Sequence, residues 1–225
     1  SEWVLFASGV RVGTATVAQT VDSIQLCGLD FVVEATPQLL PAAAGGGRFL
    51  ALPAAEYGEW AFEDYTPMAH TYNQRVASLN LGRTALPGVG APWPANGMLP
   101  VRRDIQAFRP LGDQSPSFAV SFVVGDALDT SPPDVSSYAL FIIADQGAQG
   151  FTQRFMFFRD SGEEPKAAPR FFGHLDWDRD GADELLLEVF GEGSRGYMAL
   201  EREPDGRWSS SFASACAHTA GATER

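Results

Sequence analysis

The stretch DWDRDGADELLLEVFG, residues 176–191, sets three aspartates at alternate positions and follows them with a glycine, more acid and an apolar run. Glycine permits the sharp chain reversal that a side chain would obstruct. Residues 182–190 could form a short helix by propensity, but Val189-Phe190-Gly191 would end it quickly and the following pattern is strand-like. We therefore predict a strand–turn–strand unit, with its acidic side chains gathered in the turn.

The segments outside this unit also favour β structure. Residues 11–21 (RVGTATVAQTV) alternate Val and Thr, which is typical of a half-buried strand. A Pro-Asp-Gly turn at 204–206 lies between two apolar runs, as in a β-hairpin. Further strands are predicted at 3–6, 31–34, 49–52, 60–65, 105–108, 118–124, 138–144, 151–158, 185–190, 197–201 and 208–212, and residues 71–81 could be one more. No long segment combines a 3.6-residue period with capping at its ends.

The expected fold is therefore all-β or mainly β, with antiparallel sheets in a sandwich or a partial-propeller-like arrangement and few short helices. A chain of 225 residues, 45% of them hydrophobic, can form one large core or two small ones. Residues 86–100 (LPGVGAPWPANGMLP) are rich in proline and glycine, so we expect a long loop there. Two organisations stay open: one β-rich domain over 1–225, or two subdomains divided by this loop.

The charge and the apolar runs exclude two classes of partner. The chain carries 28 acidic and 16 basic residues, for a net charge of −12. Such a surface repels phosphate backbones, so we expect no nucleic-acid binding, whereas it is compatible with cations. No run approaches the roughly 18 apolar residues of a membrane span, the nearest being 138–144. We therefore expect a protein that does not span a membrane.

Two cysteines, Cys27 and Cys216, lie near opposite ends of the chain and belong to no Cys/His cluster, which argues against zinc. In an oxidising compartment they could close a very long loop, worth about 4–5 kcal/mol in the chain-entropy model. Two buried free thiols are the alternative. We favour the disulfide because other features point outside the cell. The chain begins at Ser1, as a processed export product or a trimmed chain would, and we expect a secreted, periplasmic or cell-surface location.

The acidic turn has the composition of a calcium site. Counted from its first residue, carboxylates stand at positions one, three, five and nine, glycine at six, and at seven a residue whose carbonyl can point inward. Calcium takes six to eight oxygens at about 2.3–2.6 Å in a forgiving geometry. Without a cation the carboxylates repel one another, so the ion and the ordered turn should be coupled. The candidate ligands are Asp176, Asp178, Asp180, Ala182 and Glu184. A solvated acidic turn without a metal is the alternative.

Two known loop types open in this way. The EF-hand loop needs a bidentate Glu at position twelve, where this chain has Leu187, and Glu188 falls one place late. The preceding RFFGHL holds Gly173 and follows Pro169, which argues against an entering helix. DWDRDGADEL instead resembles the calcium loop of FG-GAP and VCBS-type repeats, whose pattern is roughly Asp-x-Asp/Asn-x-Asp-Gly-x-x-Asp/Glu-Leu before an apolar strand. Those repeats occur in integrin-like β-propellers and in many exported bacterial proteins.

The resemblance implies a set of calcium ligands, but it covers only a small part of the chain. It implies that Asp176, Asp178, Asp180 and Glu184 bind through their side chains and Ala182 through its carbonyl. It leaves Asp183 to solvent. The match covers about 25 of the 225 residues, and a propeller needs four or more blades where this chain has one such loop. We therefore expect a single calcium turn inside another β-fold.

The segment 56–65 offers an alternative function. Aromatic residues alternate there with acidic ones, and aromatic faces with carboxylates can hold sugars, while paired carboxylates can hydrolyse glycosidic bonds. Alternating aromatic residues suit the core face of a strand equally well. The candidate glycan-binding residues are Tyr57, Trp60 and Tyr65.

For the remaining motifs we expect structural roles. Residues 191–196 (GEGSRG) satisfy GxGxxG, but the YMALERE that follows is strand-like, so we predict a hairpin turn rather than a dinucleotide site. His70, His174 and His218 have no partners at a recognisable spacing, although His174 lies just before the acidic turn. We expect each histidine to be structural.

These observations predict an exported, non-catalytic β-rich protein with one structural calcium ion, acting in surface adhesion or as an accessory subunit of an extracytoplasmic assembly. A protein partner or surface assembly is expected, and no residue is assigned to catalysis. The alternative is a glycan-binding domain or carbohydrate-active enzyme that uses residues 56–65.

Overall fold

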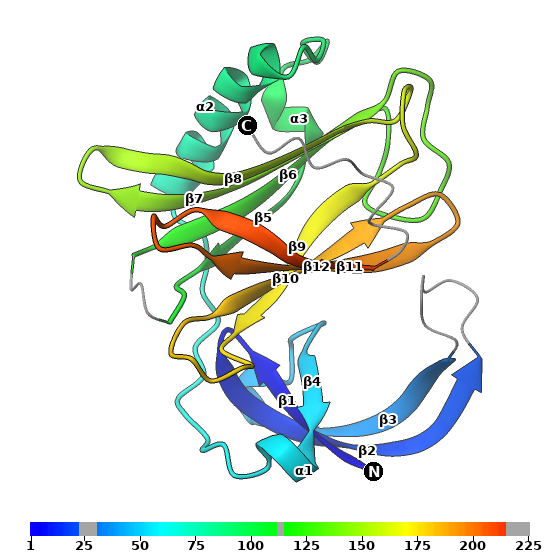
Figure 1. Cartoon of the computed structure of the whole chain (residues 1–225), viewed down its shortest axis with the longest axis vertical. Coiled ribbons are helices and arrows are strands. Elements are labelled where there is room, and N and C mark those ends of the chain that lie inside the picture. The colour runs from blue at the N-terminus through cyan, green and yellow to red at the C-terminus, as the bar shows by residue number, and fades with distance from the viewer. Residues whose placement is uncertain (23–30, 112–114, 215–225) are drawn as a thin grey trace.

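The structure is a computed structural model that describes residues 1–22, 31–111 and 115–214. Within these ranges the strands form three four-stranded antiparallel sheets. Figure 1 shows the sheet of β1–β4 at one end of the molecule, the sheet of β5–β8 with its helices at the other, and the sheet of β9–β12 between them. The prediction of a mainly β fold with antiparallel sheets is confirmed.

The β1–β4 sheet has the order β3-β2-β1-β4. Its strands are β1 (Glu2–Ala7), β2 (Val10–Asp22), β3 (Phe31–Leu39) and β4 (Leu50–Pro53), and the short η1 (Pro41–Ala43) follows β3. The long alternating strand predicted at 11–21 is β2. Ser8 and Gly9 join β1 to β2 with φ values of 50° and 78°, and positive φ at both central residues is the geometry of a type I′ hairpin.

The β5–β8 sheet has the order β5-β6-β7-β8 and is buried on both faces. Its strands are β5 (Arg102–Phe108), β6 (Ser117–Val124), β7 (Tyr138–Gly147) and β8 (Gly150–Asp160). In β7, Phe141 and Ile143 join a core shared with the β9–β12 sheet. Leu140 and Ile142 point the other way, toward the helices. Burial of both faces explains why β6 and β7 are continuous apolar runs rather than alternating ones.

The β9–β12 sheet has the order β12-β11-β10-β9 and packs face to face on the β5–β8 sheet. Its strands are β9 (Ala168–Leu175), β10 (Glu184–Phe190), β11 (Arg195–Arg202) and β12 (Trp208–Ala213). Leu185, Leu187 and Val189 of β10 point into the shared core. The hairpins predicted at 191–196 and 204–206 join β10 to β11 and β11 to β12, so both predictions are confirmed.

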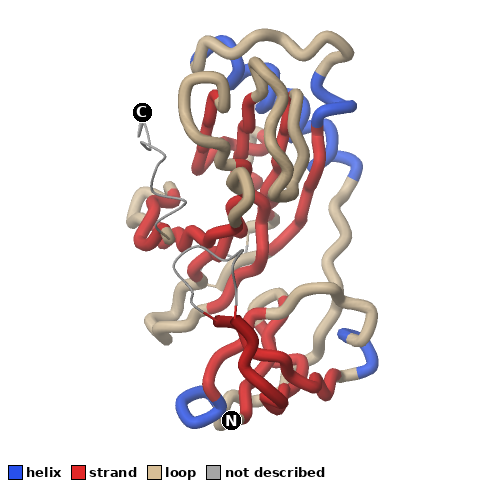
Figure 2. Tube along the Cα trace, turned by 90° about the vertical axis from the view of Figure 1, so that its right-hand side faces the viewer, coloured by secondary structure: helices blue, strands red, loops and turns tan. Residues whose placement is uncertain are grey.

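The strand suggested at 71–81 is wrong. That segment lies in α2 (Tyr72–Gly88), which begins with a capping box in which Thr71 and Gln74 each accept from the other's backbone N–H. α2 covers the outer face of the β5–β8 sheet with α3 (Met98–Val101), as Figure 2 shows from the side. Its buried residues recur every four positions and are mostly small or polar: Gln74, Ser78, Gly82 and Leu86. An apolar period was therefore absent from the sequence.

Two further expectations are corrected. Residues 60–65 were predicted as a strand, but they form an irregular segment after α1 (Ala54–Tyr57), with a single bridge from Phe62 to Arg11. The loop expected at 86–100 is shorter than predicted, because α2 runs to Gly88 with Pro87 in its last turn and α3 begins at Met98.

Three residues singled out in the sequence, Cys27, Cys216 and His218, lie outside the described residues. The predicted disulfide therefore stays a prediction. In the part of the chain that the structure describes, no helix has both the length and the apolar character needed to cross a membrane.

Candidate metal centre

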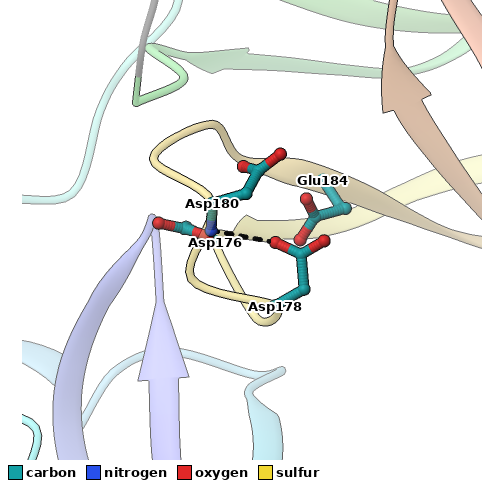
Figure 3. Close-up of side chains that lie close together, drawn as sticks. All are labelled: Asp176, Asp178, Asp180 and Glu184. Atoms are coloured by element: carbon teal, nitrogen blue, oxygen red, sulfur yellow. Dashed lines mark hydrogen bonds between the residues drawn. The ribbon is translucent and has the colours of Figure 1, made fainter.

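The acidic turn connects β9 to β10 in the predicted strand–turn–strand setting. Leu175 pairs with Glu184 at the base of the hairpin, which brings Glu184 back beside Asp176. The four carboxylates of Asp176, Asp178, Asp180 and Glu184 each offer an oxygen, and these oxygens all lie within 4.8 Å of one another. Figure 3 shows the four side chains gathered around the turn. The predicted convergence of these carboxylates is confirmed.

Hydrogen bonds from the loop's own backbone hold three of these carboxylates. Asp178 Oδ1 accepts from the N–H of Asp180 at 3.1 Å, and Asp180 Oδ1 accepts from the N–H of Ala182 at 2.9 Å. Asp176 Oδ2 accepts from the N–H of Gly181 at 3.1 Å. Gly181 has φ = 94°, which explains the glycine at this position. The turn is thus shaped by the acids that would bind an ion.

Two carboxylates are buried in the turn, and burial makes their negative charge costly. Asp176 is 7% exposed and Glu184 is 4% exposed, whereas Asp178 and Asp180 are exposed. Asp176 Oδ1 is buried and has no hydrogen-bond partner among the residues that the structure describes. A buried acceptor without a partner is destabilising, by about 1–3 kcal/mol, and a cation would supply that partner.

The pKa of Glu184 also indicates that a cation would stabilise this cluster. Burial, and after it the charges of Asp178 and Asp176, raise the pKa of Glu184 from its ordinary value of 4.5 to about 7. A hydrogen bond of 3.0 Å from the N–H of Trp177 to Glu184 Oε2 lowers the pKa and offsets this only in part. A divalent ion among these oxygens would favour the ionised form.

The donor set selects hard cations. All four side-chain donors are carboxylates, and oxygen ligands of this kind suit Ca²⁺ and Mg²⁺. The structure defines the N–H of Ala182 as a donor to Asp180, and ligation by its carbonyl stays a prediction.

The same turn contacts the N-terminal part of the chain. The Tyr57 hydroxyl donates to the Trp177 carbonyl at 2.8 Å, and Arg179 Nη2 donates to the Glu56 carbonyl at 2.7 Å. The Arg179 guanidinium also lies 5.0 Å from the centre of the Tyr57 ring and 5.6 Å from that of Trp60. The candidate metal loop therefore forms part of the junction between α1 and the β9–β10 hairpin.

The proposed glycan residues occupy two places. Tyr57 and Trp60 stack at 6.1 Å between ring centroids and, with Trp177, surround the apolar cluster of Val4 and Phe6 at this junction. Tyr65 packs against a different cluster, the core of the β1–β4 sheet. The structure thus brings Tyr57 and Trp60 together, but it joins Tyr65 to other neighbours.

Asp183 corrects an expectation drawn from the loop resemblance. It was left to solvent, yet it is 3% exposed and its Oδ2 lies 2.6 Å from Nδ1 of His174. The same oxygen accepts from the N–H of Leu111 at 2.7 Å. This acid–histidine pair was not predicted, although the two residues flank the predicted turn and a hairpin brings such flanks together. His174 is buried and has a partner after all.

Comparison with protein-family models, with curated protein sequences and with solved structures finds no match for this chain. The resemblance to FG-GAP and VCBS-type loops therefore rests on the turn and the strand that follows it.

Proposed function

We propose that residues 176–184 bind one Ca²⁺ ion in an FG-GAP-like loop, and that the ion stabilises the junction between this loop and the N-terminal part of the chain. In this proposal the protein is non-catalytic. It acts outside the cytoplasm, in surface adhesion or as an accessory subunit of an extracytoplasmic assembly.

One observation carries the calcium proposal. Asp176 Oδ1 is buried without a hydrogen-bond partner among the described residues, within a cluster whose four carboxylate oxygens lie within 4.8 Å of one another. Four carboxylates held this close, two of them buried, repel one another when all are ionised, and a cation between them removes that repulsion. Ca²⁺ fits better than Mg²⁺, because it accepts irregular sets of six to eight oxygens, with water and the Ala182 carbonyl completing the shell.

The structural role follows from what the loop touches. Trp177 and Arg179 lie between the candidate ligands and both contact the 54–60 segment. An ion that orders the turn would also place these two side chains. The extracytoplasmic role is supported by the loop resemblance and by calcium levels outside cells, where modules with dissociation constants of about 10⁻⁴–10⁻³ M are occupied.

The test is calorimetric melting in calcium and in chelator, with a matched pair of variants. Asp178→Asn removes a ligand charge. Asp205→Asn is the control, because Asp205 is also an exposed acid in a hairpin turn and accepts from the N–H two residues later, at 3.0 Å against 3.1 Å for Asp178. Free calcium at a hundred times its dissociation constant should stabilise the wild type by about 2.7 kcal/mol, which is about 5–10 °C in melting temperature.

The control should respond to calcium as the wild type does, and Asp178→Asn should lose most of the response. Terbium supplies an independent readout, since Trp177 lies within the loop and should sensitise emission from an ion bound there. If neither melting nor terbium emission distinguishes Asp178→Asn from Asp205→Asn, the turn is not a cation site.

A further inference from the structure

A cavity of about 140 Å³ is lined in part by His174, the residue whose Nδ1 lies 2.6 Å from Asp183 Oδ2. Three segments far apart in the sequence close around it: the β1–β2 hairpin with Ser8, the irregular segment 64–68, and the end of β5 with Arg109. A site built from separate segments exists only in the folded chain. It shares no side chain with the four-carboxylate cluster.

His174 presents one free ring nitrogen here. The residue is 3% exposed, and its Nδ1 is engaged by Asp183 Oδ2 at 2.6 Å. Its Nε2 has no hydrogen-bond partner among the described residues. It is also absent from the fully buried polar atoms without a partner, so part of its surface is exposed. Nε2 therefore remains accessible, and the space that His174 lines is the cavity. Asp183 is itself fixed by the N–H of Leu111 at 2.7 Å, so the imidazole is oriented in advance of any ligand.

Two side chains of opposite charge line the cavity. Asp64 and Arg109 both line it, and neither forms an ion pair with a described residue. A carboxylate would be attracted by Arg109 but repelled by Asp64, and an ammonium group would be attracted by Asp64 but repelled by Arg109. A neutral ligand that both donates and accepts hydrogen bonds can satisfy the two at once.

Hydroxyl groups have that property. In the neutral imidazole of His174, Nε2 can accept a hydrogen bond from a hydroxyl, and in the protonated ring it can donate one. Ser8 and Thr66, which carry hydroxyl groups, also line the cavity, as does the aromatic residue Tyr65. A cavity of about 150 Å³ accepts a molecule of benzene size, so this one would hold one edge of a hydroxylated six-membered ring, which is larger than benzene.

We infer that this cavity binds one neutral, hydroxyl-rich ring, the terminal residue of a glycan, with His174 Nε2, Asp64 and Arg109 as its hydrogen-bonding partners. The site differs from the grouping of Tyr57, Trp60 and Tyr65 expected from the sequence, since of these only Tyr65 lines the cavity. It needs no bound calcium as a ligand to the sugar, and its test measures sugar binding rather than calcium binding.

The experiment follows the His174 ring nitrogens by long-range ¹H–¹⁵N NMR while single sugars are added to the wild-type protein. The probes are glucose, galactose, mannose and N-acetylglucosamine, with glucuronate and glucosamine as ring-matched charged comparators. At least one neutral sugar should shift the His174 signals saturably, with a dissociation constant in the millimolar range typical of a small ligand in one shallow site. Both charged comparators should bind more weakly.

Asp64→Ala tests the mechanism without disturbing the buried His174–Asp183 pair, because Asp64 is exposed. Glu63→Ala is its control, since Glu63 is the neighbouring exposed acid and does not line the cavity. Asp64→Ala should weaken sugar binding about ten-fold or more, and Glu63→Ala should leave it unchanged. The inference is overturned if no neutral sugar shifts the His174 ring, if a charged comparator binds more tightly, or if the two variants bind alike.

Discussion

The Tyr57 hydroxyl donates a hydrogen bond to the Trp177 carbonyl, 120 residues later in the chain. This contact joins the end of α1 to the candidate metal loop. Around it lie the Arg179 guanidinium over the Tyr57 ring and the apolar cluster that contains Phe6 and Trp60. Order in the acidic turn and attachment of the N-terminal segment are therefore linked through the same few residues.

Tyr57→Phe should destabilise the protein by about 1 kcal/mol, because it removes one part-buried hydrogen bond and keeps the ring. Tyr72→Phe is the control, since Tyr72 is 70% exposed. Urea unfolding of the two variants measures the difference. Equal midpoints for both would show that the Tyr57–Trp177 bond adds nothing to stability.

Arg179→Ala should lower stability by about 1 kcal/mol, through loss of its contacts with the Tyr57 and Trp60 rings and of its bond to the Glu56 carbonyl. Arg207→Ala supplies the comparison, because Arg207 is an exposed arginine whose partner is the exposed Asp205, and such pairs contribute less than about 1 kcal/mol. Thermal unfolding in calcium checks both. A smaller loss for Arg179→Ala than for Arg207→Ala would contradict the junction role of Arg179.

Stability in chelator should fall as the pH rises from about 4.5 to about 7. The pKa of Glu184 is raised to about 7 in the folded protein, so over this window the folded state keeps a proton that the unfolded chain has released. Calcium should reverse the trend, because it binds the ionised carboxylate and competes with the proton. Melting temperatures at pH 5 and pH 7.5, in chelator and in calcium, give the comparison.

Glu184→Gln should remove the pH dependence that chelator reveals, since the variant side chain does not titrate. Glu192→Gln, at an exposed position in the next turn, should retain it. A pH profile of Glu184→Gln that superimposes on that of the wild type would assign the titration to another group.

Gly82→Ala should destabilise the protein by about 1–3 kcal/mol, although alanine favours helices. A Cβ at Gly82 would lie 2.6 Å from a Met98 carbon and 2.9 Å from a Phe122 carbon, within the packing of α2 on the β5–β8 sheet. Gly88→Ala is the control, since a Cβ there would meet no described heavy atom within 4 Å apart from its chain neighbours and the nearby backbone of its own helix. It should be neutral or stabilising by up to about 1 kcal/mol. Differential scanning calorimetry of both variants measures the difference. A Gly82→Ala variant that melts at the wild-type temperature would mean that α2 packs less closely on the sheet than described.

Strands could be predicted from the sequence where each residue's neighbours along the chain carry the information. The alternation of 11–21 and the apolar runs at 118–124 and 138–144 correspond to β2, β6 and β7. The helix at 72–88 could not be predicted in this way, because α2 is buried through small and polar side chains such as Ser78 and Gly82. A local indication of this helix existed in the Thr71–Gln74 capping box.

By itself the sequence determined the strand–turn–strand unit and the set of acids that converge in it, since alternate spacing and a glycine act over a few residues and need no distant partner. Tertiary structure alone decided that Asp176 and Glu184 are buried and that Tyr57 meets Trp177. These relationships depend on how sheets pack, and packing brings together side chains whose separation along the chain carries no trace of their contact.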